Sequence, residues 1–246
     1  MISQYHRPSD LDEALRLVAR PATVPLGGGT SLSASSDPDP IAVVDLQSVG
    51  LSGIEADSGR VSVGAMTLLQ DLVDSPLVPA AIRDLAHREA PNTLRNAATL
   101  GGTIVTADPE SELLVGLLVY ETMVTVAHEG GSAEHSLDDV LADSGLLDGG
   151  IITGMSIAGD GQASAHRTAR TPADRPIVAV VARQTGAGNV RIAASGVGPH
   201  PTLVDPDRLD ELSPPADFRG SSEYRRRLVA VLTHRALDDL GRGSGE

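Results

Sequence analysis

The sequence has no cysteine and no lysine among its 246 residues, and only 2% of its residues are aromatic. Without cysteine the chain can form no disulfide framework or thiolate zinc site, supplies no ligands for an iron–sulfur cluster, and offers no thiol nucleophile. The scarcity of aromatic side chains argues against an aromatic cage around a ligand and predicts a core of Val, Leu, Ile and Ala. Any redox chemistry performed by this chain therefore requires a bound cofactor.

Positive charge is also scarce, and the chain has a formal net charge of −14 at pH 7. Such a charge repels phosphate backbones and anionic lipids, so we expect neither nucleic acid nor a membrane surface as a partner. The N-terminus lacks a basic start followed by an apolar core, and no apolar run approaches the roughly 18 residues of a membrane helix. We therefore expect a cytoplasmic protein with no integral membrane segment.

Hydrophobic periodicity predicts a small α/β unit at the start of the chain. Apolar residues recur at helical spacing after Ser9, which we expect to be the N-cap of this helix. Two apolar runs, at residues 23–26 and 41–46, predict strands on either side of a glycine-rich turn.

A second unit begins with a hairpin whose turn is formed by residues 57–59. Periodicity then predicts helices over residues 79–90 and 111–118 and strands over residues 123–127 and 151–157. The alternating apolar residues near position 100 predict a strand, and the pair Gly101-Gly102 interrupts it, as expected where something approaches the backbone closely.

The polar stretch at residues 159–165 predicts a boundary, and a third segment follows it. This segment ends in a helix, and we expect its buried stripe to consist of Tyr224, Leu228, Val231 and Leu232.

Two glycine-rich loops are the main candidates for a ligand site. They comprise Gly27 to Ser31 and Thr99 to Thr103. Neither matches the phosphate-binding G-x-x-x-x-G-K-[ST] pattern or the dinucleotide-binding G-x-G-x-x-G pattern. Exposed N–H groups flanked by hydroxyls nevertheless suit a pyrophosphate, whereas an ordinary turn at a strand end is the simpler explanation for either loop alone. Because both loops end strands in neighbouring units, we expect a cleft between them.

The remaining polar clusters have structural interpretations beside the functional ones. Asp108, Glu110 and Glu112 suit the first turn of a helix, although a carboxylate there also suits a ribityl or ribose hydroxyl. His166, Arg167 and Arg170 suit a solvated face or an approach to an anionic group or flavin ring, and we favour the solvated face. The histidines show no metal-ligand spacing, and no nucleophile elbow is present, so we expect neither a metal site nor a serine hydrolase.

Four segments together resemble the FAD-binding subunit of the molybdenum hydroxylases, such as the medium subunit of aerobic carbon monoxide dehydrogenase and the flavin domain of xanthine dehydrogenase. They are the opening Y-H-R-P-S-D-L-D-E-A, the loop G-G-G-T-S-L, the loop T-L-G-G-T-I-V-T-A-D-P-E-S-E-L preceded by Arg95-Asn96, and the ending S-E-Y-R-R-R-L with H-R-A-L. The second loop is the most specific of the four, and the resemblance covers nearly the whole chain.

The resemblance implies an α+β fold, with a two-subdomain FAD-binding region of the p-cresol methylhydroxylase and vanillyl-alcohol oxidase type. This FAD-binding domain would span residues 1–158, with subdomains at about 1–50 and 51–158. A C-terminal α+β domain with a small antiparallel sheet and helices would span residues 159–246.

The resemblance also implies which residues line the FAD diphosphate and the nearby flavin contacts. The cofactor-binding set is Leu26, Gly27, Gly28, Gly29, Thr30, Ser31, Thr99, Gly101, Gly102, Thr103, Ser111 and Glu112. Many relatives have Asn or Ser where this chain has Thr103, and the chain is somewhat shorter than is usual in the family. Arg167 is the nearest candidate for the Lys or Tyr that relatives place beside the flavin ring.

The function that the resemblance implies is electron transfer, with no catalytic residue required from this chain. FAD would take electrons from an iron–sulfur small subunit and pass them to an external acceptor, while a molybdopterin large subunit oxidises the substrate within a hetero-oligomer. The absence of cysteine is consistent with iron–sulfur centres held by a partner. Two alternatives remain open at this point: a self-contained flavin oxidoreductase of the same fold, and a scaffold subunit that has lost FAD.

Overall fold

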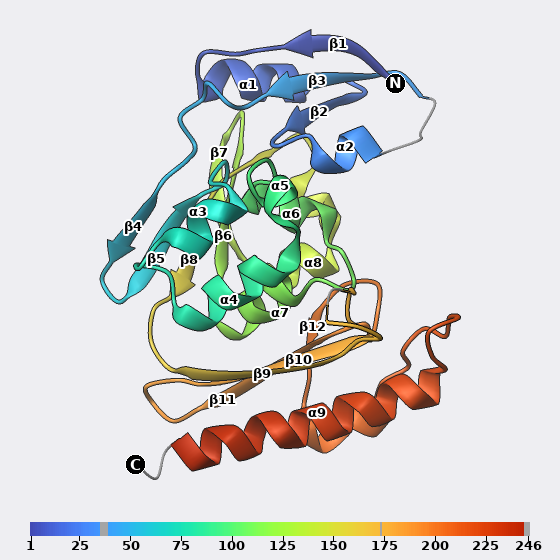
Figure 1. Ribbon diagram of the computed structural model, residues 1–246. Helices are drawn as coiled ribbons and strands as arrows, with labels where there is room; N and C mark the ends of the chain where they lie inside the picture. Colours follow the sequence, from blue (N-terminus) through green and yellow to red (C-terminus); the bar gives the residue numbers. More distant parts are fainter. Residues whose placement is uncertain (35–38, 173, 244–246) are drawn as a thin grey trace.

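The computed structural model describes residues 1–34, 39–172 and 174–243, and the last three residues of the expected C-terminal domain lie outside this set. Three sheets are stacked along the molecule, with helices between and outside them (Figure 1). Among the described residues, no helix is both long and apolar enough to cross a membrane.

The first sheet is parallel and has the strand order β1-β3-β2. Its strands and the helices that accompany them are β1 (Ile2–His6), α1 (Leu11–Val18), β2 (Thr23–Leu26), α2 (Thr30–Ala34) and β3 (Ile41–Asp45). The predicted helix and both predicted strands are present, but the N-cap is Asp10, not Ser9. The Asp10 carboxylate accepts a hydrogen bond from the N–H of Glu13 at 2.8 Å, while Ser9 lies one residue before the cap.

The second sheet is antiparallel and has the order β4-β5-β8-β6-β7. Its strands are β4 (Ile54–Asp57), β5 (Arg60–Gly64), β6 (Met123–His128), β7 (Gly131–Ser136) and β8 (Ile151–Ala158). The helices beside it are α3 (Leu69–Asp74), α4 (Ala80–Glu89), α5 (Asn92–Arg95), α6 (Leu100–Thr106), α7 (Glu112–Val119), α8 (Leu137–Ala142) and the 3-10 turn η1 (Ser144–Leu147). The predicted hairpin is therefore present as β4 and β5, and the predicted helices are present as α4 and α7.

The prediction of a strand around the second glycine pair is wrong, because residues 100–106 form the helix α6. Leu100 and Ile104, four residues apart, are both buried and lie in the same core cluster. Thr99 caps the helix, since its hydroxyl accepts a hydrogen bond from the N–H of Gly102 at 3.1 Å. The burial of one helical face thus determines the local structure despite the alternating pattern.

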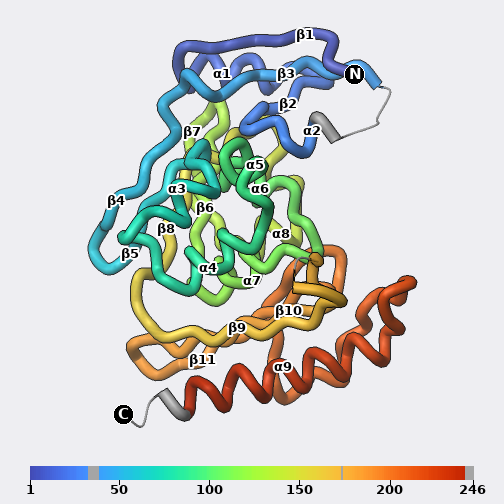
Figure 2. The backbone as a smooth tube through the Cα atoms, in the orientation of Figure 1, coloured from blue at the N-terminus to red at the C-terminus, as the bar shows by residue number. Residues whose placement is uncertain are grey.

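The third sheet is antiparallel and has the order β12-β11-β10-β9. Its elements are β9 (Gln162–Thr168), β10 (Val178–Gln184), β11 (Val190–Ser195), β12 (Thr202–Leu203), the 3-10 turn η2 (Pro206–Glu211) and α9 (Ser222–Gly243). The sheet lies between α7 and α9 (Figure 2). Alternate residues of β10 therefore face different layers: Val181 joins the core around α7, while Val178 and Val180 join the core beneath α9.

The buried stripe of α9 agrees with the predicted one only in part. Leu232 is buried and Leu228 is partly buried as predicted, whereas Tyr224 and Val231 are each 43% exposed and Val229 is buried in their place. Arg225 is also buried, because its guanidinium donates to the carbonyl oxygens of Ile177 at 2.6 Å and Gly196 at 3.1 Å. Because Arg225 belongs to the inward face of α9, this face is not the one that hydropathy alone predicts.

Candidate functional site

The two glycine-rich loops pack directly against each other in the structure. A Cβ atom built on Gly28 would stand 1.7 Å from the carbonyl oxygen of Ala97, and one built on Gly27 would stand 2.7 Å from Oγ1 of Thr99. The loop between β2 and α2 thus packs its backbone directly onto the segment that leads into α6. Glycine at both positions makes this close approach possible.

The N–H groups of the two loops differ in whether they are already hydrogen-bonded. All four N–H groups in the first turn of α6 have partners inside the chain: Leu100 donates to Thr67, Gly101 to Ala65, and both Gly102 and Thr103 to Thr99. By contrast, the N–H groups of Gly27 and Gly28 donate to no other described residue. The first loop therefore supplies the N–H donors that remain available for an anionic group.

Hydroxyl groups line the edges of the two loops. The Thr106 hydroxyl donates to the carbonyl oxygen of Gly102 at 2.8 Å, so Ser31 must donate in its own contact of 3.0 Å with the Thr106 hydroxyl. The Thr103 hydroxyl donates to the carbonyl oxygen of Thr99 at 3.1 Å. Thr30 begins α2 and is half-buried. Ser31 and Thr106 therefore connect α2 to α6 across the cleft.

The adjacent glycines of α6 have different surroundings. Gly101 is buried, and a Cβ atom built on it would lie 2.9 Å from the carbonyl oxygen of Ala65. Gly102 is exposed, and a Cβ built on it would lie 3.0 Å from Oγ1 of Thr99 but near no other described residue outside its own helix backbone. Packing within the chain explains the missing side chain of Gly101, whereas Gly102 leaves an open surface at the start of α6.

Arg95 holds in place the segment that leads into α6, and this residue is only 6% exposed. Its guanidinium donates to the carbonyl oxygens of His87 at 2.8 Å and Ala90 at 2.7 Å, and to the side chain of Gln70 at 3.0 Å. These bonds connect α5 to α3 and α4. Arg95 therefore fixes the position of the segment that leads into the second glycine-rich loop.

The predicted site residues Ser111 and Glu112 lie at the start of α7 and are bound by other parts of the chain. The Glu112 carboxylate is 5% exposed and forms ion pairs with Arg167 of β9 at 2.9 Å and Arg88 of α4 at 3.7 Å. Ser111 caps α7 and donates its hydroxyl proton to Glu89 at 3.0 Å. Both residues thus contribute to a charged junction between the second and third sheets.

A second carboxylate, Glu89, completes this junction. It accepts hydrogen bonds from the Leu113 N–H at 3.1 Å and from Arg175 at 3.1 Å, and Arg175 also binds Asp108. Burial raises the pKa of Glu89 above its usual value, against the opposing effect of the nearby Arg175 charge. Sequence reasoning missed Glu89, Arg88 and Arg175, because no local pattern indicates contacts between residues so far apart along the chain.

The other polar clusters also have partners within the chain. Glu110 pairs with Arg219, and Arg170 pairs with Asp174 at 3.5 Å. His166 contacts Asp239 of α9 at 2.8 Å. No group of three or more metal-ligating side chains occurs in the part of the chain that the structure describes.

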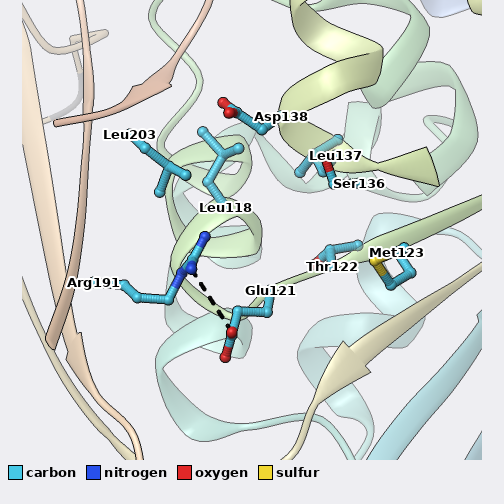
Figure 3. Close-up of a pocket in the computed structure, with 9 residues that line it drawn as sticks. All are labelled: Leu118, Glu121, Thr122, Met123, Ser136, Leu137, Asp138, Arg191 and Leu203. Atoms are coloured by element: carbon cyan, nitrogen blue, oxygen red, sulfur yellow. Dashed lines mark ion pairs between the residues drawn. The ribbon is translucent and has the colours of Figure 1, made fainter. Parts of the chain in front are cut away.

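A separate hollow of about 240 Å³ lies between the second and third sheets, away from the glycine loops. Figure 3 shows Arg191 of β11 and Glu121 facing each other across it, with an ion-pair distance of 3.7 Å, and Asp138 of α8 at its other end. None of the predicted site residues lines this hollow.

Comparisons with known proteins identify the family. The family model described as the FAD-binding domain in molybdopterin dehydrogenase matches residues 1–157. The uncharacterised protein YgfM of Escherichia coli K12 is 29% identical over 249 residues, covering 94% of each chain. The glyceraldehyde dehydrogenase medium chain of Sulfolobus acidocaldarius is 26% identical, covering 96% of this chain and 97% of its own.

The fold also matches a solved structure. Carbon monoxide dehydrogenase from Hydrogenophaga pseudoflava contains a chain that superimposes with a TM-score of 0.87 and 21% identity, covering 97% of each chain. This chain belongs to the FAD-binding family of the molybdopterin dehydrogenases. The expected α+β FAD-binding fold, the FAD cofactor and the oxidoreductase class are therefore confirmed.

Proposed function

We propose that this chain is the FAD-carrying electron-transfer subunit of a molybdenum hydroxylase complex. It takes electrons from an iron–sulfur small subunit and passes them to an external acceptor, while a molybdopterin large subunit oxidises the substrate. The bound flavin supplies the redox chemistry by accepting electrons and releasing them again. A cytoplasmic location and the division into domains at residues 1–158 and 159–246 belong to the same proposal.

The observation that supports this proposal best is the packing of the two glycine loops. The N–H groups of Gly27 and Gly28 have no protein partner among the described residues, and they lie at the contact with the start of α6. A diphosphate bound there would receive hydrogen bonds from these groups and would approach the bare surface of Gly102. Backbone N–H groups can hold such an anion without a lysine side chain, which this chain does not contain.

The remaining predicted site residues act in two ways in this proposal. Leu26 and Gly29 shape the first loop, and the hydroxyls of Thr30 and Ser31 lie along its rim. Thr99 and Thr103 hold the first turn of α6 through their bonds with Gly102 and with each other. Ser111 and Glu112 position the junction behind the cleft, through Glu89, Arg88 and Arg167.

No side chain of this chain needs to transfer a proton to a substrate in this function. The carboxylates at the junction are held by arginines, and the chain has no cysteine with which to ligate a cluster. Binding the cofactor, excluding water from it and fixing its distance to partner subunits are the tasks left to the protein. The substrate would be recognised by another subunit.

The proposal is tested by adding FAD to the purified apo-chain and by reconstituting it with candidate small and large subunits. We expect stoichiometric flavin uptake, followed by flavin reduction when substrate is added only to the three-subunit mixture. A chain that takes up no FAD would be a scaffold, and a chain that turns over substrate alone would be a self-contained oxidoreductase. Either result would overturn the proposed electron-transfer role.

A further inference from the structure

The only phenylalanine of the chain, Phe218, is 89% exposed on a rigid turn just before α9. The Asp217 carboxylate accepts hydrogen bonds from the N–H groups of Arg219 at 2.9 Å and Gly220 at 3.1 Å, which close the turn. The same carboxylate binds buried Arg225 at 2.7 Å. In Figure 1 this segment extends past the end of the third sheet. The fold therefore holds a large apolar ring out in solvent.

The exposed face of α9 continues from this turn. Gly220 packs against the ring of Tyr224, since a Cβ atom built there would lie 2.7 Å from the ring. Tyr224, Arg227, Val231 and Arg235 then follow at intervals of three and four residues, so they share one face of the helix. A hollow of about 380 Å³ lies beside Val231. We call Phe218 and these four residues the α9 outer surface.

The charge of this surface differs from that of the chain as a whole. The chain has a net charge of −14, yet α9 contains five arginines and only three carboxylates. Arg227 and Arg235 are exposed and form no ion pair or hydrogen bond with any described residue. Arg183 shows the contrast with an arginine bound within the chain, since it pairs with Asp160 at 2.6 Å and Glu121 at 3.0 Å. Unpaired arginines beside exposed aromatic rings are typical of protein interfaces.

We propose that the α9 outer surface docks a partner subunit whose face combines an apolar pocket for Phe218 with carboxylates for Arg227 and Arg235. This inference rests on the proposed function, because it assigns the partner to the same multi-subunit complex. A second copy of the chain is the poorer occupant, because a two-fold contact of this face with itself would bring arginines against arginines. The rigid turn presents Phe218 already ordered, which lowers the entropic cost of docking.

The test uses the complex reconstituted from this chain and the candidate small and large subunits. We expect a photo-crosslinking amino acid at position 218 to link the chain to one of these subunits. We also expect Phe218→Ser and Arg227→Glu each to weaken assembly by about thirtyfold or more, the scale of an interface hot spot. Leu77→Ser and Arg16→Glu change an exposed apolar side chain and an exposed arginine elsewhere, so they are the matched controls.

FAD content and melting temperature establish that each variant is folded. Both should equal those of the wild type, because Phe218 and Arg227 make no buried contacts. If folded variants assemble with wild-type affinity, or if position 218 links only to a second copy of the chain, the α9 outer surface is not the docking site. If the wild-type chain itself binds neither subunit, the proposed function fails, and this inference fails with it.

Discussion

The adjacent glycines of α6 should respond in opposite ways to the same substitution. A Cβ atom at Gly101 would meet the Ala65 carbonyl oxygen at 2.9 Å and the Ala65 Cβ at 3.0 Å, both in the core. A Cβ atom at Gly102 would enter solvent, with only Oγ1 of Thr99 near it, at 3.0 Å. The first position is closed by the protein itself, whereas the second is open to a ligand.

These contacts set the expected changes in the free energy of unfolding of the apo-protein. Replacing glycine by alanine inside a helix stabilises it by about 0.5–1 kcal/mol. At Gly101 this gain is outweighed by overpacking, which costs about 1–3 kcal/mol, so Gly101→Ala should destabilise the protein. At Gly102 the tight contact with Thr99 removes part of the gain, so Gly102→Ala should lie between neutral and about 1 kcal/mol more stable.

At Gly102, the same substitution should weaken FAD binding although it does not lower stability. If the diphosphate approaches the bare backbone there, a methyl group displaces it, and we expect the FAD dissociation constant to rise at least about tenfold, or 1.4 kcal/mol. Gly102→Val, with a branched side chain, should abolish binding while leaving most secondary structure intact. Gly101→Ala should retain FAD affinity closer to that of the wild type whenever it is folded.

The assay combines urea denaturation of each apo-protein with titration of FAD monitored by flavin fluorescence. The informative result is a Gly102→Ala protein that is at least as stable as the wild type yet binds FAD more weakly, because instability cannot then explain the loss. Wild-type FAD affinity in both Gly102→Ala and Gly102→Val would refute the reasoning and remove α6 from the cofactor site.

Three further predictions concern the charged contacts. Glu112→Ala removes the ion pairs of Arg167 and Arg88 and should lower the free energy of unfolding, measured by urea denaturation, by about 2–3 kcal/mol. This value is near the lower limit for a buried pair, because Arg88 is 34% exposed. A tenfold rise in the FAD dissociation constant of the folded variant would instead show direct contact with the cofactor. The pKa of Glu89 is raised, so the folded state binds the proton of this carboxyl group more tightly than the unfolded state does. The stabilisation that results from this binding is complete below pH 4.5 and is lost as the pH rises through the folded pKa. Glu89→Gln should therefore gain stability relative to the wild type between pH 4.5 and 7, and a constant difference across this range would contradict the assignment. Arg183→Met removes four hydrogen bonds of a guanidinium that is 1% exposed and should cost about 3 kcal/mol or more, whereas a change below 1 kcal/mol would show that its burial is easily compensated.

Local patterns were sufficient to predict most elements that lie on one face of a core. The helices α1 and α4 follow from their apolar spacing, α7 follows from a continuous apolar run that is buried along its whole length, and the β4–β5 hairpin follows from its glycine-containing turn. The α6 error has a specific cause: threonine and valine suggest a strand, whereas Thr99 is a good N-cap and Leu100 and Ile104 stand at helical spacing. In the folded chain, these helical signals outweigh the strand propensity of threonine and valine.

Contacts between distant segments were not predictable from one sequence. The guanidinium of buried Arg225 donates to the carbonyl oxygens of Ile177, just before β10, and Gly196, just after β11, whereas hydropathy assigns arginine to the surface. The junction around Glu112 joins three elements, and each of its members looks like an ordinary surface charge in its own segment. The sequence did indicate that the two glycine loops lie together, although the reason given for it, that both loops end strands, is wrong for the second loop, which begins α6.

The glycines of these loops lack a side chain for different physical reasons. Where the chain itself fills the space, a substitution tests how the loops pack. Where the space is open, a substitution tests how the ligand binds. Gly27 and Gly28 are bare because the backbone and hydroxyl of residues 97–99 occupy the space of their side chains. Substituting either one must push the two loops apart, so a loss of FAD binding there would be ambiguous. Of the loop glycines whose surroundings the structure describes, Gly102 is the one that faces solvent, and the loops pack without any contribution from its missing side chain. At Gly102, weaker FAD binding without lower stability therefore reports the ligand itself.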